Sequence, residues 1–222
     1  IVLDNDGYVS DTDTLTLRGM NPDATDPSTT GRESVSADFT AAGDVANPMV
    51  TVDDQFGQTL YRLRTIAAVG RLTFRPVNFE LLGGDDRISV IGRDEADLLI
   101  NIDGGNEGAL LPQSDHITVV GSPDMDYLEV VPGATGDAGT LFVHRGPVPI
   151  TTVNFTNTED IIFDGGNGTG GDLLLVRGTG APDAFTLQAF TSQGGVAQVG
   201  NGPPINFFHL DTDGAGGPHS GI

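Results

Sequence analysis

Two acidic turns near the ends of the chain have the residue types and spacing that calcium ligands need. Leu3-Asp4-Asn5-Asp6-Gly7 and Leu210-Asp211-Thr212-Asp213-Gly214 each place two carboxylates on alternate residues before a glycine. Alternate oxygen ligands ahead of a glycine turn begin many calcium-binding loops. The simpler interpretation is an Asx-turn, in which the carboxylates only accept hydrogen bonds from nearby backbone N–H groups. The candidate metal ligands in these turns are Asp4, Asp6, Asp211 and Asp213.

A third acidic turn contains a glycine pattern that also occurs in nucleotide-binding proteins. Residues 166–171, Gly-Asn-Gly-Thr-Gly-Gly, fit G-x-G-x-x-G between Asp164 and Asp172. A dinucleotide site needs a helix after this turn, because the helix N-terminus binds the pyrophosphate. Here Asp172-Leu-Leu-Leu-Val runs into another glycine turn with no helical pattern. The sequence therefore argues against nucleotide binding and leaves Asp164 and Asp172 as further candidate calcium ligands.

Catalytic groups are scattered along the chain. Neither a G-x-S-x-G elbow nor an H-E-x-x-H motif is present. His116 falls on the outward position of an expected strand, which is typical of a solvated surface histidine. Clusters such as Asp94/Glu95/Asp97 could act as a polysaccharide-cleaving pair, as in the parallel β-helix pectate lyases, but close carboxylates are unavoidable among 31 acidic residues. We predict that the protein is not an enzyme.

The charge of the chain limits its partners. Ten Lys and Arg residues, all of them Arg, stand against 31 Asp and Glu residues, which gives a net charge of −21. A field this negative repels nucleic acid and anionic membranes and attracts cations. No apolar run approaches the roughly 18 residues of a membrane span. We therefore expect no nucleic-acid partner and no membrane insertion, and the absence of Cys excludes disulfides and thiolate metal sites.

Two further features concern processing. The chain starts at Ile1, without Met, so we expect a processed product or a piece of a longer protein. Two sequons, Asn154-Phe-Thr156 and Asn167-Gly-Thr169, could be glycosylated only in a compartment that has the machinery. Chance occurrence is the simpler explanation of both.

The elements that must position these residues are organised by an internal repeat, D-x-h-x-h-x-G, in which h is apolar. Alternation places the h residues on one buried face of a strand. The closing Gly suits a positive φ or a sharp corner, and the Asp can hold the corner through an Asx-turn. Alternating runs at Leu128/Val130 and Phe185/Leu187 predict further strands of this kind. The four repeat copies are 13–19, 86–92, 115–121 and 172–178.

Short strands between Asp/Gly corners predict an all-β fold. The preferred architecture is a right-handed β-solenoid, similar to a parallel β-helix, because no coil can bury its own face and stacking supplies the core. The alternative is a pair of tandem Ig-like or cadherin-like β-sandwiches. It rests on the recurrence of Val77-Asn78-Phe79 as Val153-Asn154-Phe155, at about the spacing of one such module. The window Gln58–Val69 is interpreted as a strand.

The expected domain organisation follows from the same repeat. We expect a single repetitive β domain over residues 1–222, with 20–48 as a long polar loop insertion and 211–222 as a Gly-rich tail. Under the sandwich alternative the chain divides near 1–76 and 77–222.

Taken together, the repeat units, the Val-Asn-Phe elements and the Asp-Gly-Gly turns resemble the Asp/Gly-rich repeat regions of large secreted bacterial surface proteins, adhesins and S-layer-like proteins. The turn at Asp164 is also loosely similar to the hemolysin-type (RTX) nonapeptide GGxGxDxhx, from which it departs by two extra residues, Thr169 and Gly170. This resemblance implies an extracellular or cell-surface location, a structural or adhesive role, and Ca²⁺ as a stabilising cofactor.

The sequence therefore predicts an extracellular structural protein that self-assembles into a filament or surface layer. The echo between the two terminal Leu-Asp-x-Asp-Gly motifs suggests that the ends of one copy meet those of a neighbour, and open sheet edges template such pairing. The expected partner is the protein itself or neighbouring repeats, with surface glycans as a second candidate. Two alternatives stay open: a carbohydrate-binding or polysaccharide-cleaving β-helix protein, and a calcium-dependent adhesion module.

Overall fold

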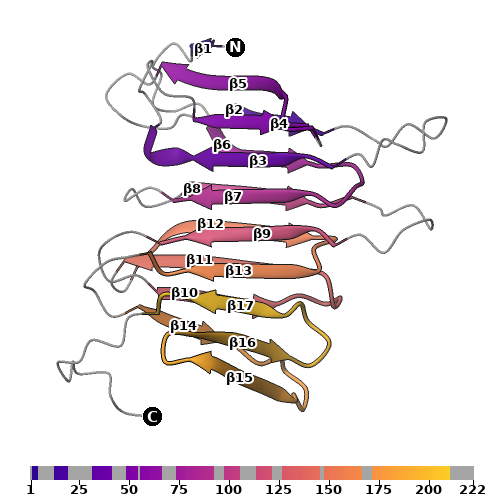
Figure 1. Cartoon of the computed structure of the whole chain (residues 1–222), viewed down its shortest axis with the longest axis vertical. Coiled ribbons are helices and arrows are strands. Elements are labelled where there is room, and N and C mark those ends of the chain that lie inside the picture. The colour runs from indigo at the N-terminus through magenta and orange to yellow at the C-terminus, as the bar shows by residue number, and fades with distance from the viewer. Residues whose placement is uncertain are drawn as a thin grey trace.

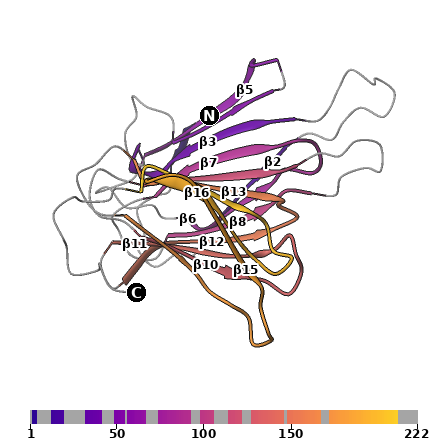
Figure 2. The same ribbon diagram turned by 60° about the horizontal axis from the view of Figure 1, so that its bottom comes forward.

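The computed structural model describes residues 2–4, 13–19, 32–41, 49–54, 56–66, 74–92, 98–105, 114–121, 127–145, 148–166 and 172–210. Over these residues the protein is all-β, as the sequence predicts, with one mixed sheet of ten strands and one of seven. The two sheets lie one behind the other, and their strands stack along the longest axis of the molecule (Figure 1; Figure 2). Within this part of the chain, no helix is long and apolar enough to cross a membrane.

Across each sheet, the strands follow an order that differs from their order in the chain. The ten-stranded sheet contains β1 (Val2–Asp4), β5 (Thr59–Ile66), β4 (Val50–Asp53), β3 (Ser34–Asp38), β7 (Arg87–Ile91), β9 (His116–Val120), β13 (Asp160–Asp164), β17 (Ile205–Phe208), β16 (Gly194–Val199) and β15 (Phe185–Thr191). The seven-stranded sheet contains β14 (Leu173–Val176), β10 (Tyr127–Pro132), β11 (Gly139–Arg145), β12 (Val148–Thr156), β8 (Leu98–Asp103), β6 (Phe74–Glu80) and β2 (Asp13–Arg18). One 3-10 helix, η1 (Phe39–Ala41), follows β3.

The chain crosses repeatedly between the two sheets, with hairpins inserted within each sheet. The chain passes from β2 to β3, from β6 to β7, from β8 to β9 and from β12 to β13, each time leaving the seven-stranded sheet for the ten-stranded one. Strands β3, β7, β9, β13 and β17 pair in parallel, as do β2, β6, β8 and β12. Antiparallel hairpins such as β4–β5 and β15–β16 extend the sheets at their ends.

The segment 20–48 is not a loop throughout, because residues 34–38 form β3. Val35 and Ala37 alternate with exposed serines and point into the core. In the pairing of β3 with β7, Val35 lies beside Ile88 and Ala37 lies beside Val90, so the buried residues of the two strands are aligned. The window predicted as a strand at 58–69 contains β5, which confirms that interpretation.

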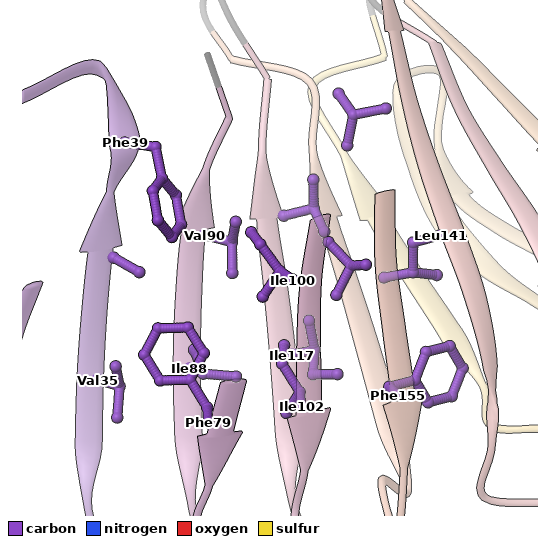
Figure 3. Packing of buried hydrophobic residues seen from close by; sticks show 14 of the residues in the cluster. Val35, Phe39, Phe79, Ile88, Val90, Ile100, Ile102, Ile117, Leu141 and Phe155 are labelled. Atoms are coloured by element: carbon purple, nitrogen blue, oxygen red, sulfur yellow. The ribbon is translucent and has the colours of Figure 1, made fainter. Parts of the chain in front are cut away.

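In-register apolar rows fill the space between the sheets. In the ten-stranded sheet, Val35, Ile88 and Ile117 are aligned on neighbouring strands and are at most 3% exposed. In the seven-stranded sheet, Ile100 and Val153 form an equivalent row and are fully buried. Figure 3 shows side chains from both sheets meeting in this layer. Burying each such side chain contributes about 1.5–3 kcal/mol, so the alternation detected in the sequence supplies the main driving force for stacking.

None of the four glycines that close the repeat units has a positive φ, and three of them, Gly19, Gly92 and Gly178, leave little room for a side chain. A Cβ on Gly19 would lie 2.6 Å from a carboxylate oxygen of Glu33 and 2.7 Å from the Leu81 carbonyl oxygen. A Cβ on Gly92 would lie 2.6 Å from the Thr151 hydroxyl. The positive-φ interpretation of these glycines is therefore wrong, while the sharp, crowded corner is observed.

A row of acidic side chains links the corners that precede four neighbouring strands of the ten-stranded sheet. Its members, which directly precede β3, β7, β9 and β13, are Glu33, Asp86, Asp115 and Glu159. The backbone N–H of Glu33 donates to Asp86 Oδ1 at 2.6 Å, and that of Asp86 donates to Asp115 Oδ1 at 2.8 Å. The N–H of Asp115 donates to Glu159 Oε2 at 2.8 Å. Each accepting carboxyl group therefore satisfies a backbone donor of the neighbouring corner.

This row holds Asp86 in an unusual protonation state. Its side chain is fully buried. Burial, together with the charge and side-chain hydrogen bond of Glu33, raises the pKa of the Asp86 carboxyl from 3.8 to about 8, although the Glu33 N–H bond opposes the shift. At neutral pH the Asp86 carboxyl is therefore largely protonated beside the Glu33 side chain. Because the folded-state pKa exceeds the unfolded value, this contribution to stability is complete below about pH 4 and is lost as the pH rises to about 8.

Asp86→Asn should remove this pH dependence, since the amide keeps an acceptor for the Glu33 N–H and a donor for its carboxylate. The difference in unfolding free energy, variant minus wild type, should grow with pH by at most about 1.4 kcal/mol per unit. Urea unfolding between about pH 5 and about pH 8 measures it. The matched control is Asp85→Asn, which removes the same charge from the neighbouring, partly exposed residue. The raised pKa of Asp86 would be contradicted if the difference in unfolding free energy for Asp86→Asn did not change with pH. It would also be contradicted if this difference grew equally with pH in both variants.

Candidate assembly surface at the ends of the sheets

The large hydrophobic side chains that are exposed lie at the two ends of the strand stack. All of them, within the described ranges, belong to the three strands nearest a sheet edge or to the turn between two such strands. At the end formed by β4 and β5 they are Phe56 and Leu60; at the opposite end they are Leu173, Phe185, Leu187, Phe190 and Phe208. Exposure of large hydrophobic side chains is therefore a property of the ends of the stack, although the terminal strands also bury some apolar residues, such as Val50 and Ile205.

Strand β15 exposes residues that face the core side of its sheet. Phe185 pairs with Val199, and Leu187 pairs with Ala197, on the adjacent strand β16. Cross-strand partners share a face of the sheet, and Val199 and Ala197 are buried. Yet Phe185 is 61% exposed and Leu187 is 72% exposed. The two side chains thus point toward the core layer at a place where the described part of the chain leaves them uncovered.

The cause is a difference in where the two sheets end. In Figure 1, β15 lies beyond β14, the last strand of the seven-stranded sheet at this end. Leu174 and Val176 of β14 still pack partly against the core. No described strand of the seven-stranded sheet lies further along to cover β15. We call this feature the terminal step: the edge strand β14 together with the overhanging strand β15.

Neither strand of the terminal step carries the charge or proline that usually protects an edge from pairing. Edge strands are normally protected by charged residues, by proline or by a covering element. Strand β15, FTLQAFT, has seven residues and contains no charge and no proline. Strand β14, LLLV, has four residues and likewise contains none. Uncharged strands of high β-propensity are those that pair most readily with another chain.

Polar contacts beside the apolar layer hold β14 in place. Arg177 Nε lies 2.7 Å from Glu129 Oε1 on the neighbouring strand β10. Glu129 Oε2 also lies 3.3 Å from His144 Nε2, and the His144 ring stacks on Tyr127 with centroids 3.9 Å apart. Burial lowers the pKa of His144, and the Glu129 carboxylate opposes this shift only in part. His144 is therefore neutral at pH 7, and Arg177 is the cation that balances Glu129.

The residues predicted to bind calcium are described only in part. Asp164 Oδ1 accepts hydrogen bonds from the Gly166 N–H at 3.0 Å and from His209 Nδ1 at 2.7 Å. The first of these contacts forms an Asx-turn. A Cβ on Gly165 would lie 2.6 Å from an oxygen of Asp172, so this carboxylate packs against the same turn. The turn therefore brings Asp164 and Asp172 to neighbouring positions.

Calcium binding stays a prediction at all six positions. Asp4 ends β1, and Asp6, Asp211 and Asp213 lie outside the described residues. Within the described ranges, no group of three or more His, Asp or Glu side chains is arranged to hold a metal ion. The acidic cluster at 94–97 also falls outside those ranges.

A second surface feature is a row of amides on the outer face of the seven-stranded sheet. Asn101 Nδ2 donates to Asn78 Oδ1 at 2.8 Å, and Asn154 Nδ2 donates to Asn101 Oδ1 at 2.9 Å. A shallow groove of about 300 Å³ runs along this row. The two rings beside it, Phe79 and Phe155, are buried in the core. The accessible surface of the groove is therefore mainly apolar, and its described lining residues include no exposed ring for stacking.

Comparison of the chain with protein-family models, with curated proteins and with solved structures gave no match. Any proposal about function therefore depends on the geometry of this chain.

The sequence predicts the strands of the terminal step correctly and places their side chains in the wrong environment. The alternating pairs Leu128/Val130 and Phe185/Leu187 have the same pattern, which predicts burial for both. Leu128 and Val130 are at most 3% exposed, which confirms the first pair, whereas the second is mostly exposed. No local signal over 185–191 reveals this difference, because charge or proline would normally mark an outer edge strand and this stretch contains neither.

The contrast between the two pairs gives a direct test by truncation. Leu128→Ala should lower the unfolding free energy by about 2–5 kcal/mol, because it leaves a cavity in the packed core. Leu187→Ala should change it by less than about 0.5 kcal/mol in dilute protein, since the side chain is already solvated. Urea unfolding of both variants at low protein concentration measures the difference. A similar large loss in both would show that Leu187 is covered within the single chain.

Proposed function

We propose that this protein is an extracellular, non-enzymatic structural protein that assembles with copies of itself through the ends of its two sheets. The observation that carries the proposal is the confinement of exposed large hydrophobic side chains, among the described residues, to those ends. Contiguous apolar surface on a soluble protein marks an interaction site. Repeated contacts of this kind build a filament or a surface layer.

We infer that the stacked coils form a β-solenoid, in keeping with the sequence prediction. The repeated crossings between the two sheets support this, because β6, β7, β8 and β9 add one strand in turn to each sheet. The in-register pairing of β7, β9 and β13 supports it as well. Solenoids need terminal caps to stay soluble as single copies. An end that the described part of the chain leaves uncovered therefore favours assembly. The right-handedness of the coil stays a prediction.

The tandem-sandwich alternative has less support. Strand β2 pairs with β6, and β3 pairs with β7, so strands from both sides of a division near 76 and 77 share both sheets. This sharing favours one continuous stack over two separate modules.

The location at the cell surface and the stabilisation by Ca²⁺ remain predictions from the resemblance to secreted repeat proteins. For glycan binding, the groove along the Asn78–Asn154 row is the available surface. Its amides already pair with one another, and exposed rings that stack on sugars are absent from its described lining. We therefore favour self-assembly over a carbohydrate-binding role.

The net charge of −21 sets the condition under which assembly should occur. Copies of the protein repel one another, and salt screens this repulsion. The Debye length falls from about 30 Å at 0.01 M salt to about 8 Å at 0.15 M. We expect sedimentation velocity and electron microscopy to show mostly single copies at low salt and larger assemblies at higher salt and concentration. A single copy under all these conditions would overturn the proposed function.

A charge placed on the terminal step should block this assembly. Leu187→Glu should raise the dissociation constant by roughly 100-fold, because burial of a Leu side chain contributes about 1.5–3 kcal/mol and the new carboxylate must be desolvated. The matched control is Ser36→Glu, which adds the same charge to an exposed position on β3, in the middle of the stack. Equal weakening in both variants would indicate a general charge effect and contradict a role for the step.

A further inference from the structure

We propose that two copies join tail to tail through their terminal steps, with β15 of each copy completing the β14 edge of the other. This inference rests on the proposed self-assembly and specifies its first contact. The contact is then two-fold symmetric, which means that both copies contribute the same surface to it.

The shape of the step favours this arrangement. At this end the ten-stranded sheet projects past β14 by the strand β15 (Figure 1). A two-fold axis along the strand direction exchanges the front and back sheets and reverses the stacking direction. The projecting strand of each copy then occupies the vacant position beside the other copy's β14. Both sheets continue across the contact, and neither edge is left open.

A simple head-to-tail stack fits less well. The ten-stranded sheet also projects past β2 at the opposite end, where β5 and β1 lie beyond the seven-stranded sheet (Figure 1). If β15 met β1 of a second copy, the ten-stranded sheet of one copy would meet the ten-stranded sheet of the other, because β1 and β15 are its two edge strands. The seven-stranded sheets would then be separated by a gap with apolar side chains facing it. The two-fold arrangement leaves no such gap.

Strand directions are compatible with pairing across the two-fold axis. Strand β14 is parallel to β10 and thus runs the same way as β12. Strand β15 runs the same way as β17 and β13. Only residues 157–159 connect the end of β12 to the start of β13 in the other sheet. Three residues are too few to return along the length of a strand, so the two sets run in opposite directions. A rotation about the strand axis preserves direction, and the added β15 would therefore be antiparallel to β14.

The same rotation covers the exposed side chains. Phe185 and Leu187 of one copy would face the corresponding residues of the other copy across the axis, continuing the apolar layer between the sheets. Neither strand of the step carries a charge. Although each copy has a net charge of −21, the two strands of the step therefore place no like charges against one another. The complementary step, the strand directions and the absence of charge all favour a second copy as the occupant.

A filament needs one further contact, and the other end of the stack can supply it. Phe56 and Leu60 are 69% and 41% exposed there. Alternating tail-to-tail and head-to-head contacts produce an open chain of copies without any head-to-tail interface.

Single-cysteine cross-linking tests the arrangement, because the chain has no cysteine of its own. Leu187→Cys should form a covalent dimer with a short bis-maleimide when it is the only variant present, since its copies meet across the axis. Phe56→Cys marks the opposite end, and Ser36→Cys marks the middle of the stack. An equal mixture of Leu187→Cys and Phe56→Cys should give no cross-link between the two variants above that of the mid-stack control.

The outcomes separate the inference from the proposed function. Cross-linking only between Leu187→Cys and Phe56→Cys would overturn the tail-to-tail contact and leave self-assembly in place. Association by sedimentation without any cross-link at position 187 would overturn it in the same way. A single copy at all concentrations would overturn both proposals. In that case, protection of the new thiol of Leu187→Cys from a monofunctional maleimide would show that the chain covers its own step.

Discussion

Every stack of strands must end, and this constraint governs the behaviour that we propose for the protein. An inner strand has a partner on each side and a second sheet opposite its apolar face. The last strand lacks one partner, and β15 also lacks the opposite sheet in the described part of the chain. Its core-facing residues Phe185 and Leu187 are mostly exposed for this reason, although their pattern is the same as that of buried residues elsewhere. The exposed backbone edge and the exposed apolar face coincide at one place, and a second copy can satisfy both.

The inner part of the stack is held by contacts that depend on register. Parallel strands align Val35 with Ile88 and Ile117, and the same alignment brings each acidic corner residue to the backbone N–H of its neighbour. Buried carboxyl groups are costly unless they are hydrogen-bonded, and here they accept from backbone donors that would otherwise be unpaired. A slip of one residue would lose the acidic row and turn the apolar side chains outward at once. The row therefore specifies one register, and protonation of Asp86 lets two carboxyl groups share one corner.

Much of the fold could be predicted from the sequence, because alternation and Asp/Gly corners are local signals. The repeat beginning at Asp86 and that beginning at Asp115 are the neighbouring strands β7 and β9, whereas the repeat beginning at Asp172 contains β14 in the other sheet. The pattern detects the strand and carries no information about its sheet. Likewise, the pattern at Phe185/Leu187 cannot show that no coil lies beyond it, since burial depends on what the rest of the chain places opposite. The Asx-turn at Asp164 is observed, while a calcium ion there would depend on oxygens from several turns, which one local motif does not determine.

Hydrogen–deuterium exchange measured as a function of protein concentration tests the central claim most directly, because it reports on the edge amides themselves. We expect amides of β14 and β15 to exchange rapidly in dilute protein and to become protected as the concentration rises. Amides of β7 and β9, in the middle of the ten-stranded sheet, should be protected at every concentration. Exchange of β14 and β15 that does not depend on concentration, while larger assemblies form, would show that the copies join elsewhere and would contradict the proposed contact.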